Sequence, residues 1–332
     1  MSNAIQRYHG TTRPMDRFTG ILIPEGADPG AVIMSDPILS SPIVAVPLMR
    51  ASFKAPGGFA DVTDKYMVRQ HDDHPLGVVG DRYRALQPKD IAAMLSTLHA
   101  NFGLQFQTAM LLEDGATFLT QANLRTIDLG PLQSRRGAKR DTGGRDIVQG
   151  FLTIADNYTG KRTATAGCSS TRAVCENTAA HAMSESAKSL FGRPIRHTGD
   201  VAGKLSQWEH AIEDAIKALG RFETFARAAV STPIARDTAA GIVETLIPLP
   251  EGARPGKAQA KRDAIMGAFD SGMGNSGRSV WDLYNGVTEF ANWSAPVKGA
   301  DADTARLESL LWNGLGDLVQ EAENQLRVYL SL

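Results

Sequence analysis

The chain has few of the features that build disulfide-bonded or membrane-embedded folds. It contains 2 cysteines among 332 residues, too few for the disulfide framework of a small secreted protein. No stretch approaches the roughly 18 uninterrupted apolar residues of a membrane-spanning helix, and the first residues contain no apolar run of signal-peptide length. We therefore expect a cytoplasmic protein with no membrane span.

The chain also has almost no net charge, and its aromatic residues are few. The 35 Lys and Arg residues are balanced by 36 Asp and Glu residues, for a net charge of -1, and aromatic residues make up 7% of the chain. Any binding of nucleic acid must therefore come from a local basic patch rather than from overall charge. Few aromatic side chains are available to stack on bases. The hydrophobic fraction of 42% suffices for a sizeable core.

The first part of the chain reads as β structure with one helix. Up to about residue 87, short runs rich in Val and Ile and broken by Pro and Gly predict irregular strands. Pro88 and the helical spacing of the apolar residues after it predict a helix that ends at Gly103. A hairpin is predicted next, in which residues 104–112 pair with 116–127 around Gly115.

A second hairpin is predicted to turn at residues 157–160. Its outgoing strand, 161–174, leads without a proline break into residues 176–192, which are rich in Ala, Met and Leu and end at Gly192. This composition predicts a helix of about four turns. Two hairpins are thus expected to run into a helix.

The last third of the chain is predicted to be helical, because apolar residues recur every three or four positions beyond residue 200. The predicted helices cover 205–225, 235–246, 258–269, 280–293 and 304–329. The resulting fold class is α+β, with β-hairpins packed with helices and followed by a helical C-terminal extension. We expect an α+β core domain at 1–200 and a helical region at 201–332 packed on it.

Three segments carry a resemblance to a known family. They are TRAVCENT at 171–178 with RHT at 196–198, HPLGVVGDRYRALQP at 74–88, and SVWDLYNGVTEFANW at 279–293. They resemble the sequence blocks of the phage- and plasmid-like proteins of domain-of-unknown-function family 932, and the resemblance spans roughly residues 60–330. The chain departs from the family pattern at Ala173, Ala179 and Gly286. The resemblance implies a phage or plasmid context and brings no established activity.

A basic segment lies between the two predicted hairpins. SRRGAKRDTGGR places five basic residues within a Gly-rich stretch of eleven, and two more follow at the second hairpin turn. Several Arg and Lys side chains on one loop can neutralise backbone phosphates and release counterions. The alternative is an exposed loop that is basic for solubility. The predicted nucleic-acid interface consists of Arg135, Arg136, Lys139, Arg140, Arg145, Lys161 and Arg162.

Hairpins followed by a helix also resemble the core of single-strand annealing proteins of the RecT and Red-beta sort. That resemblance implies rings or filaments that hold one strand in a basic groove. We therefore expect a non-enzymatic accessory protein of a phage or plasmid that binds single-stranded DNA in recombination or replication and acts as a homo-oligomer. A self-assembling scaffold without a ligand is an alternative.

A second cluster is predicted within the family-like segments, and consists of Arg172, Asn177, Thr178, His197 and Thr198. Asn177 and Thr178 are suited to capping the predicted helix, and Arg172 to binding an anion or a buried carboxylate. If these residues converge, the Arg172, Asn177 and His197 group is a candidate site of an enzyme acting on a small molecule or nucleotide. Otherwise they fix the junction between strand and helix.

No metal and no cofactor are expected from the sequence. Cys168 and Cys175 are seven positions apart, unlike the pair spacing of two to four residues in zinc sites. Gly272, Gly274 and Gly277 match GxGxxG, but they follow a helical segment instead of a strand, which disfavours a dinucleotide-binding fold. Catalytic residues are therefore not assigned.

Overall fold

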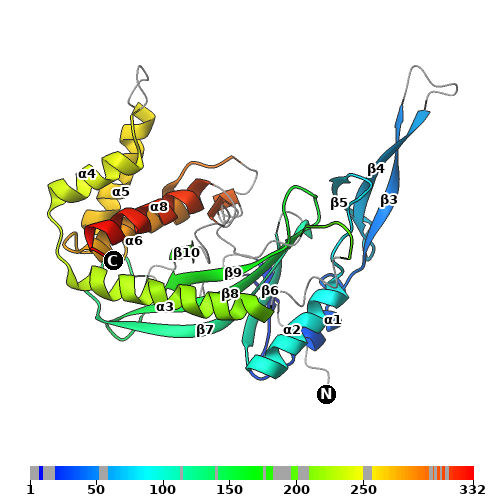
Figure 1. Ribbon diagram of the computed structural model, residues 1–332, viewed down its shortest axis with the longest axis horizontal. Helices are drawn as coiled ribbons and strands as arrows, with labels where there is room; N and C mark the ends of the chain where they lie inside the picture. The colour runs from blue at the N-terminus through cyan, green and yellow to red at the C-terminus, as the bar shows by residue number, and fades with distance from the viewer. Residues whose placement is uncertain are drawn as a thin grey trace.

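The computed structural model describes residues 7–9, 19–51, 59–112, 115–138, 141–174, 177–181, 196–200, 209–249, 256–298, 302, 305–306, 309–310 and 314–332. A long antiparallel sheet crosses the middle of the molecule, a smaller sheet projects at one end, and helices gather at the other (Figure 1). The fold is α+β, as predicted; two helices lie between strands, and the other helices of the described residues follow the last strand.

The large sheet has seven strands in the order β1-β2-β6-β7-β8-β9-β10, all paired antiparallel. The strands are β1 (Arg7–His9), β2 (Thr19–Leu22), β6 (Gln105–Leu112), β7 (Thr117–Pro131), β8 (Arg145–Asn157), β9 (Thr165–Arg172) and β10 (Asn177–His181). Both predicted hairpins are confirmed as β6 with β7 and β8 with β9. Gly115 lies at the first hairpin turn with φ of 96°, a conformation that only glycine adopts readily.

The helix predicted for residues 176–192 is wrong at its start. Residues Asn177–His181 form strand β10, in which Asn177 lies opposite Arg172 and Thr178 opposite Thr171 of β9. Edge pairing to a buried strand supplies the backbone hydrogen bonds that a helix would otherwise form, and this tertiary context overrides the helical propensity of the segment. The remainder of the predicted helix, from residue 182 on, lies outside the described residues.

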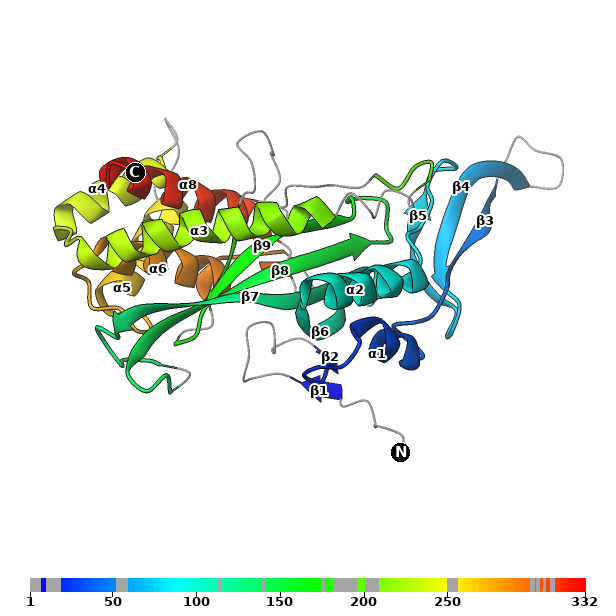
Figure 2. The same ribbon diagram turned by 60° about the horizontal axis from the view of Figure 1, so that its bottom comes forward.

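One face of the large sheet is covered by two helices, α2 (Pro88–Phe102) and α3 (Glu209–Ser231) (Figure 2). Gly150 of β8 allows α3 to lie close, because a Cβ atom at this position would be 2.6 Å from Cδ1 of Leu219. The predicted start and stop signals of α2 are confirmed, with Pro88 in the first turn and Gly103 left-handed at φ 65°. The short helix α1 (Pro29–Ser35), which the sequence analysis missed, packs on α2.

The smaller sheet projects from the body as an arm (Figure 1). It consists of β3 (Ile43–Ala51), β4 (Phe59–Arg69) and β5 (His74–Val79), in that order. Arg69 joins the arm to the body, because a Cβ atom at Gly115 would lie 2.0 Å from its Nη1 atom. The same guanidinium binds Asp72 at the turn between β4 and β5. The strands predicted for this part of the chain are therefore present, and they form a separate sheet.

The remaining helices form a compact group at the opposite end of the large sheet. They are α4 (Arg236–Leu246), α5 (Gly256–Ser271), α6 (Val280–Glu289), the π-helical turn η3 (Phe290–Ser294) and α8 (Gly314–Tyr329). Trp281 and Tyr284 stack at 5.5 Å between ring centroids within their core. Ile127 and Val148 of the sheet belong to the same buried cluster, so these helices and the sheet share a core. Within the described residues no helix is long and apolar enough to cross a membrane.

Candidate functional site

The predicted basic loop joins β7 to β8 and is attached to the helical end of the molecule. A hydrogen bond from the Leu132 N–H to the Gly144 carbonyl closes the loop at 2.8 Å. Gly274, between α5 and α6, donates its N–H to the Arg136 carbonyl at 3.0 Å. The Ser276 hydroxyl donates to the side chain of Gln133 at 2.9 Å. The loop backbone is therefore held by the loop between α5 and α6.

The basic side chains of this loop differ in their surroundings. Arg135 and Arg136 are exposed and form no ion pair within the described part of the chain. Arg145 binds Asp128 at 2.7 Å, and its hydrogen bond is the main cause that lowers the pKa of the Asp128 carboxyl. Lys139 and Arg140 of the predicted interface lie outside the described residues. Arg135 and Arg136 thus keep their charge available for a ligand.

Lys161 and Arg162 are not brought to this loop. Both lie in the turn between β8 and β9, whereas Arg145 begins β8 at its opposite end. At about 3.3 Å per residue, the length of β8 separates the two groups by roughly 40 Å. The interface predicted from the sequence is therefore two separate basic groups, of which the β7–β8 loop carries the larger.

Arg172 lies at the end of β9 and is only 3% exposed. Its guanidinium donates to both carboxylate oxygens of Asp146, at 2.8 and 2.7 Å, and to the side-chain oxygen of Asn275 at 2.8 Å. The Trp281 indole donates to Asp146 as well, at 2.9 Å, and its ring lies 5.7 Å from the guanidinium carbon. We call Arg172, Asp146, Asn275 and Trp281 the arginine lock. It is a buried ion pair whose charges are met by hydrogen bonds on all sides, as a stable buried pair requires.

The arginine lock reaches the basic loop through Gly274. Arg172 donates to the Gly274 carbonyl at 3.2 Å, and the N–H of the same glycine holds Arg136. A Cβ atom at Gly274 would lie 2.8 Å from Val174, and its φ is 76°. The close approach and the left-handed backbone both require glycine. This accounts for one glycine of the GxGxxG match without a phosphate-binding role.

His197 lies elsewhere, beside the turn between β8 and β9. Its Nε2 atom is 3.0 Å from a carboxylate oxygen of Asp156, and its ring stacks on Tyr83 with 4.7 Å between centroids. The Arg84 N–H donates to the His197 carbonyl at 2.8 Å, and the Tyr83 hydroxyl donates to the Asn157 carbonyl at 2.9 Å. Burial, and to a smaller extent the charge of Asp156, raise the pKa of Tyr83.

The convergence of Arg172 with His197 is not found. Their carboxylate partners, Asp146 and Asp156, are ten residues apart on β8, which corresponds to roughly 33 Å in an extended strand. Asn177 lies opposite Arg172 but in a strand instead of at a helix start, so neither it nor Thr178 caps a helix there. Thr198 is exposed beside His197. The geometry gives these residues no common site.

The family-like segments instead meet in two pairs. TRAVCENT touches SVWDLYNGVTEFANW through Arg172 and Trp281, and RHT touches HPLGVVGDRYRALQP through His197 and Tyr83. The sequence analysis missed Asp146 and Asp156, since an acidic residue within a strand gives no signal of burial. Trp281 and Tyr83 lie inside the family-like segments. The sequence alone did not show that Trp281 contacts Arg172 or that Tyr83 contacts His197.

Among the described residues, which include Cys168, no three His, Cys, Asp or Glu side chains are grouped to hold a metal ion. Cys168 is fully buried in β9, and burial raises the pKa of its thiol. Cys175 lies outside the described residues. Thiolate chemistry at Cys168 is therefore disfavoured.

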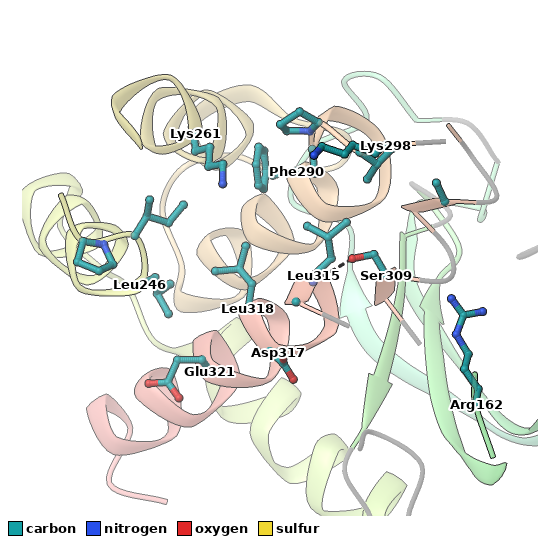
Figure 3. A pocket seen from close by; sticks show the side chains of 17 residues that line it. Arg162, Leu246, Lys261, Phe290, Lys298, Ser309, Leu315, Asp317, Leu318 and Glu321 are labelled. Atoms are coloured by element: carbon teal, nitrogen blue, oxygen red, sulfur yellow. Dashed lines mark hydrogen bonds between the residues drawn. The ribbon is translucent and has the colours of Figure 1, made fainter. Parts of the chain in front are cut away.

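A pocket of about 840 Å³ opens among the C-terminal helices, and the sequence analysis did not predict it. The end of α4, the chain after η3 and the first half of α8 form it (Figure 3). Leu246, Phe290, Leu315 and Leu318 supply apolar surface. Arg162, from the turn between β8 and β9, lines its far side.

The fold and these contacts define an α+β protein in which a buried arginine lock joins a sheet to a helical group and positions a basic loop. Residues 75–312, more than two thirds of the chain, match the family described as a domain of unknown function (DUF932). The protein belongs to that family. Neither the comparison with curated proteins nor that with solved structures gives a match.

Proposed function

We propose that this protein is a non-enzymatic accessory protein that binds single-stranded DNA through the basic loop between β7 and β8. The observation that carries the proposal is the pair Arg135 and Arg136, both exposed and without an acidic partner in the described part of the chain. Their loop is held at its backbone by Gly274 and at the Gln133 side chain by Ser276. In this proposal the protein acts as a homo-oligomer in phage or plasmid recombination or replication, in the cytoplasm.

Fixation of the loop favours binding in physical terms. A ligand that binds a flexible loop must order it, and that entropy cost reduces the affinity. Here the loop is already held through Gly274 by a buried ion pair. Arginine forks also suit bidentate contacts with phosphate oxygens, and such contacts carry affinity without sequence preference.

The test measures binding of a fluorescein-labelled oligo(dT) by fluorescence anisotropy over a series of salt concentrations. We expect salt-sensitive binding by the full chain, because bound phosphates release counterions. The variant Arg135→Ala/Arg136→Ala should bind more weakly, and its logarithmic salt slope should fall by about 0.7 for each lost contact to a single strand.

The matched control is Lys217→Ala/Lys257→Ala, which removes the same charge from exposed positions on α3 and α5. Its affinity and salt slope should stay close to those of the unchanged chain. Absence of binding at low salt, or an equal loss in both double variants, would contradict the proposal. An equal loss would show that only overall charge matters.

A further inference from the structure

Three segments of the chain meet where the arm adjoins the large sheet (Figure 1). They are residues 80–87 after β5, residues 158–164 between β8 and β9, and residues 196–200. The ring of Tyr83 joins them, because it stacks on His197 and a Cβ atom at Gly160 would lie 3.6 Å from its Cδ2 atom. The Arg84 N–H also donates to the His197 carbonyl. These contacts fix the three backbones relative to one another.

Each of these segments contributes exposed basic side chains, and we call the group the junction patch. It consists of Arg82, Arg84, Lys161 and Arg196. None of the four forms an ion pair with a residue that the structure describes. The acidic residues of the three segments are Asp81, which binds Lys65 at 3.1 Å, and exposed Asp200. The surface at this junction is therefore predominantly basic.

The junction patch suits a polyanion in charge and in arrangement. Its cations are carried by three separate backbones, so they spread over a surface instead of converging on one point. A chain with repeating phosphates can meet such a surface, because each Lys or Arg contacts a different phosphate. Arginine forks add bidentate contacts with phosphate oxygens. Because the backbones are already fixed, binding does not have to order them, a cost that would otherwise reduce affinity.

We propose that the junction patch binds a second stretch of the same single DNA strand that the basic loop holds. This inference rests on the proposed function and gives its ligand a further contact. The two basic groups lie at opposite ends of β8, roughly 40 Å apart. A strand stacked at about 3.4 Å per nucleotide spans that distance with about 12 nucleotides. A short strand therefore reaches one group, and a long strand reaches both.

The first test compares oligo(dT) of about 5 and about 30 nucleotides by fluorescence anisotropy, since only the longer strand links both groups. The variant Arg82→Ala/Lys161→Ala/Arg196→Ala leaves Arg84 and its bonds to the Asp81 and Tyr83 carbonyls in place. Its affinity for the long strand should fall by about 10-fold or more. Its salt slope should fall by about 2, for three lost contacts at about 0.7 each. Its affinity for the short strand should change by less than about 3-fold, because the basic loop is intact.

The matched control is Lys217→Ala/Lys257→Ala/Lys261→Ala, which removes the same charge from exposed positions on α3 and α5. It should bind both strands as the unchanged chain does. A second measurement requires no substitution: lysines are acetylated with acetic anhydride, and the modified positions are read by mass spectrometry. The long strand should protect Lys161 from acetylation and leave Lys217 reactive in the same sample.

Normal binding of the long strand by the junction variant would overturn the inference. So would an equal loss in the lysine control, or equal acetylation of Lys161 with and without the strand. If the unchanged chain binds neither strand, the proposed function fails and this inference fails with it. If Arg135→Ala/Arg136→Ala weakens binding and the junction variant does not, only this inference fails. The reverse result would retain the junction patch as a DNA contact and overturn the role of the basic loop.

Discussion

Strand β8 carries a buried carboxylate near each end, and the two carboxylates differ in how completely they are hydrogen-bonded. Asp146 accepts hydrogen bonds from Arg172 and Trp281 through both oxygens. Asp156 lies 3.0 Å from His197 through one oxygen, while its other oxygen has no hydrogen-bond partner among the described residues. One end is a saturated ion pair and the other is an incompletely satisfied contact.

This difference shows which end of β8 fixes a neighbouring loop in position. A guanidinium stays charged at all physiological pH values, and its fork matches a carboxylate, so the arginine lock is permanent. Its contacts extend through Gly274 to the backbone of the basic loop. The His197 end holds residues 196–198 against Tyr83 and Arg84, beside the turn between β8 and β9.

The same substitution at both carboxylates tests this contrast most strongly. Asp146→Asn should lower the free energy of unfolding by about 3–5 kcal/mol, because it leaves the Arg172 charge buried without a counter-charge. Urea unfolding followed by Trp fluorescence and circular dichroism measures the change. Asp146→Asn should also weaken oligo(dT) binding, because the basic loop loses its support. A cost below about 1 kcal/mol, as for a surface pair, would break the comparison.

Removal of both partners should cost less than the two single changes together. In Arg172→Met/Asp146→Asn no unpaired charge remains, and the Asn oxygen can still accept from the Trp281 indole. A double-mutant cycle with Arg172→Met should give a coupling energy of about 1–3 kcal/mol. The matched cycle at exposed Arg145 and Asp128 should give under about 1 kcal/mol. Equal coupling in both cycles would mean that burial adds nothing to the lock.

Much of this architecture follows from local sequence patterns. Pro88 and Gly103 mark the ends of α2 because their backbone preferences are local, and Gly115 marks a hairpin turn for the same reason. Residues 177–181 were misread because pairing with β9 overrides an Ala-rich composition. Asp146 was not found because its role depends on Trp281, 135 residues away. The spacing of apolar residues along the chain gives no information about a contact between residues so far apart in the sequence.

Asp156→Asn should have a smaller effect than Asp146→Asn. The Asn oxygen can still accept from the Asn157 N–H, which now donates to Asp156 at 2.7 Å, and only the imperfect contact with His197 is altered. We expect a loss of about 1–3 kcal/mol, the cost of one buried polar group left unsatisfied. Oligo(dT) binding should not change. A loss equal to that of Asp146→Asn would show that the two carboxylates contribute equally to stability, and would contradict the contrast between the two ends of β8.

The smallest effect is expected at Asp72, the exposed carboxylate of the ion pair with Arg69 in the arm. The hydrogen bond from Arg69 and its charge lower the pKa of Asp72 to about 2. An unfolded Asp titrates near 3.9, so the pair stabilises the fold above that pH, and the stabilisation is lost as the pH falls toward 2. The difference in urea midpoint between the unchanged chain and Asp72→Asn should therefore be present at about pH 6 and shrink below about pH 4. A difference that stays constant over this range would show that Asp72 acts through packing or turn geometry rather than through its charge.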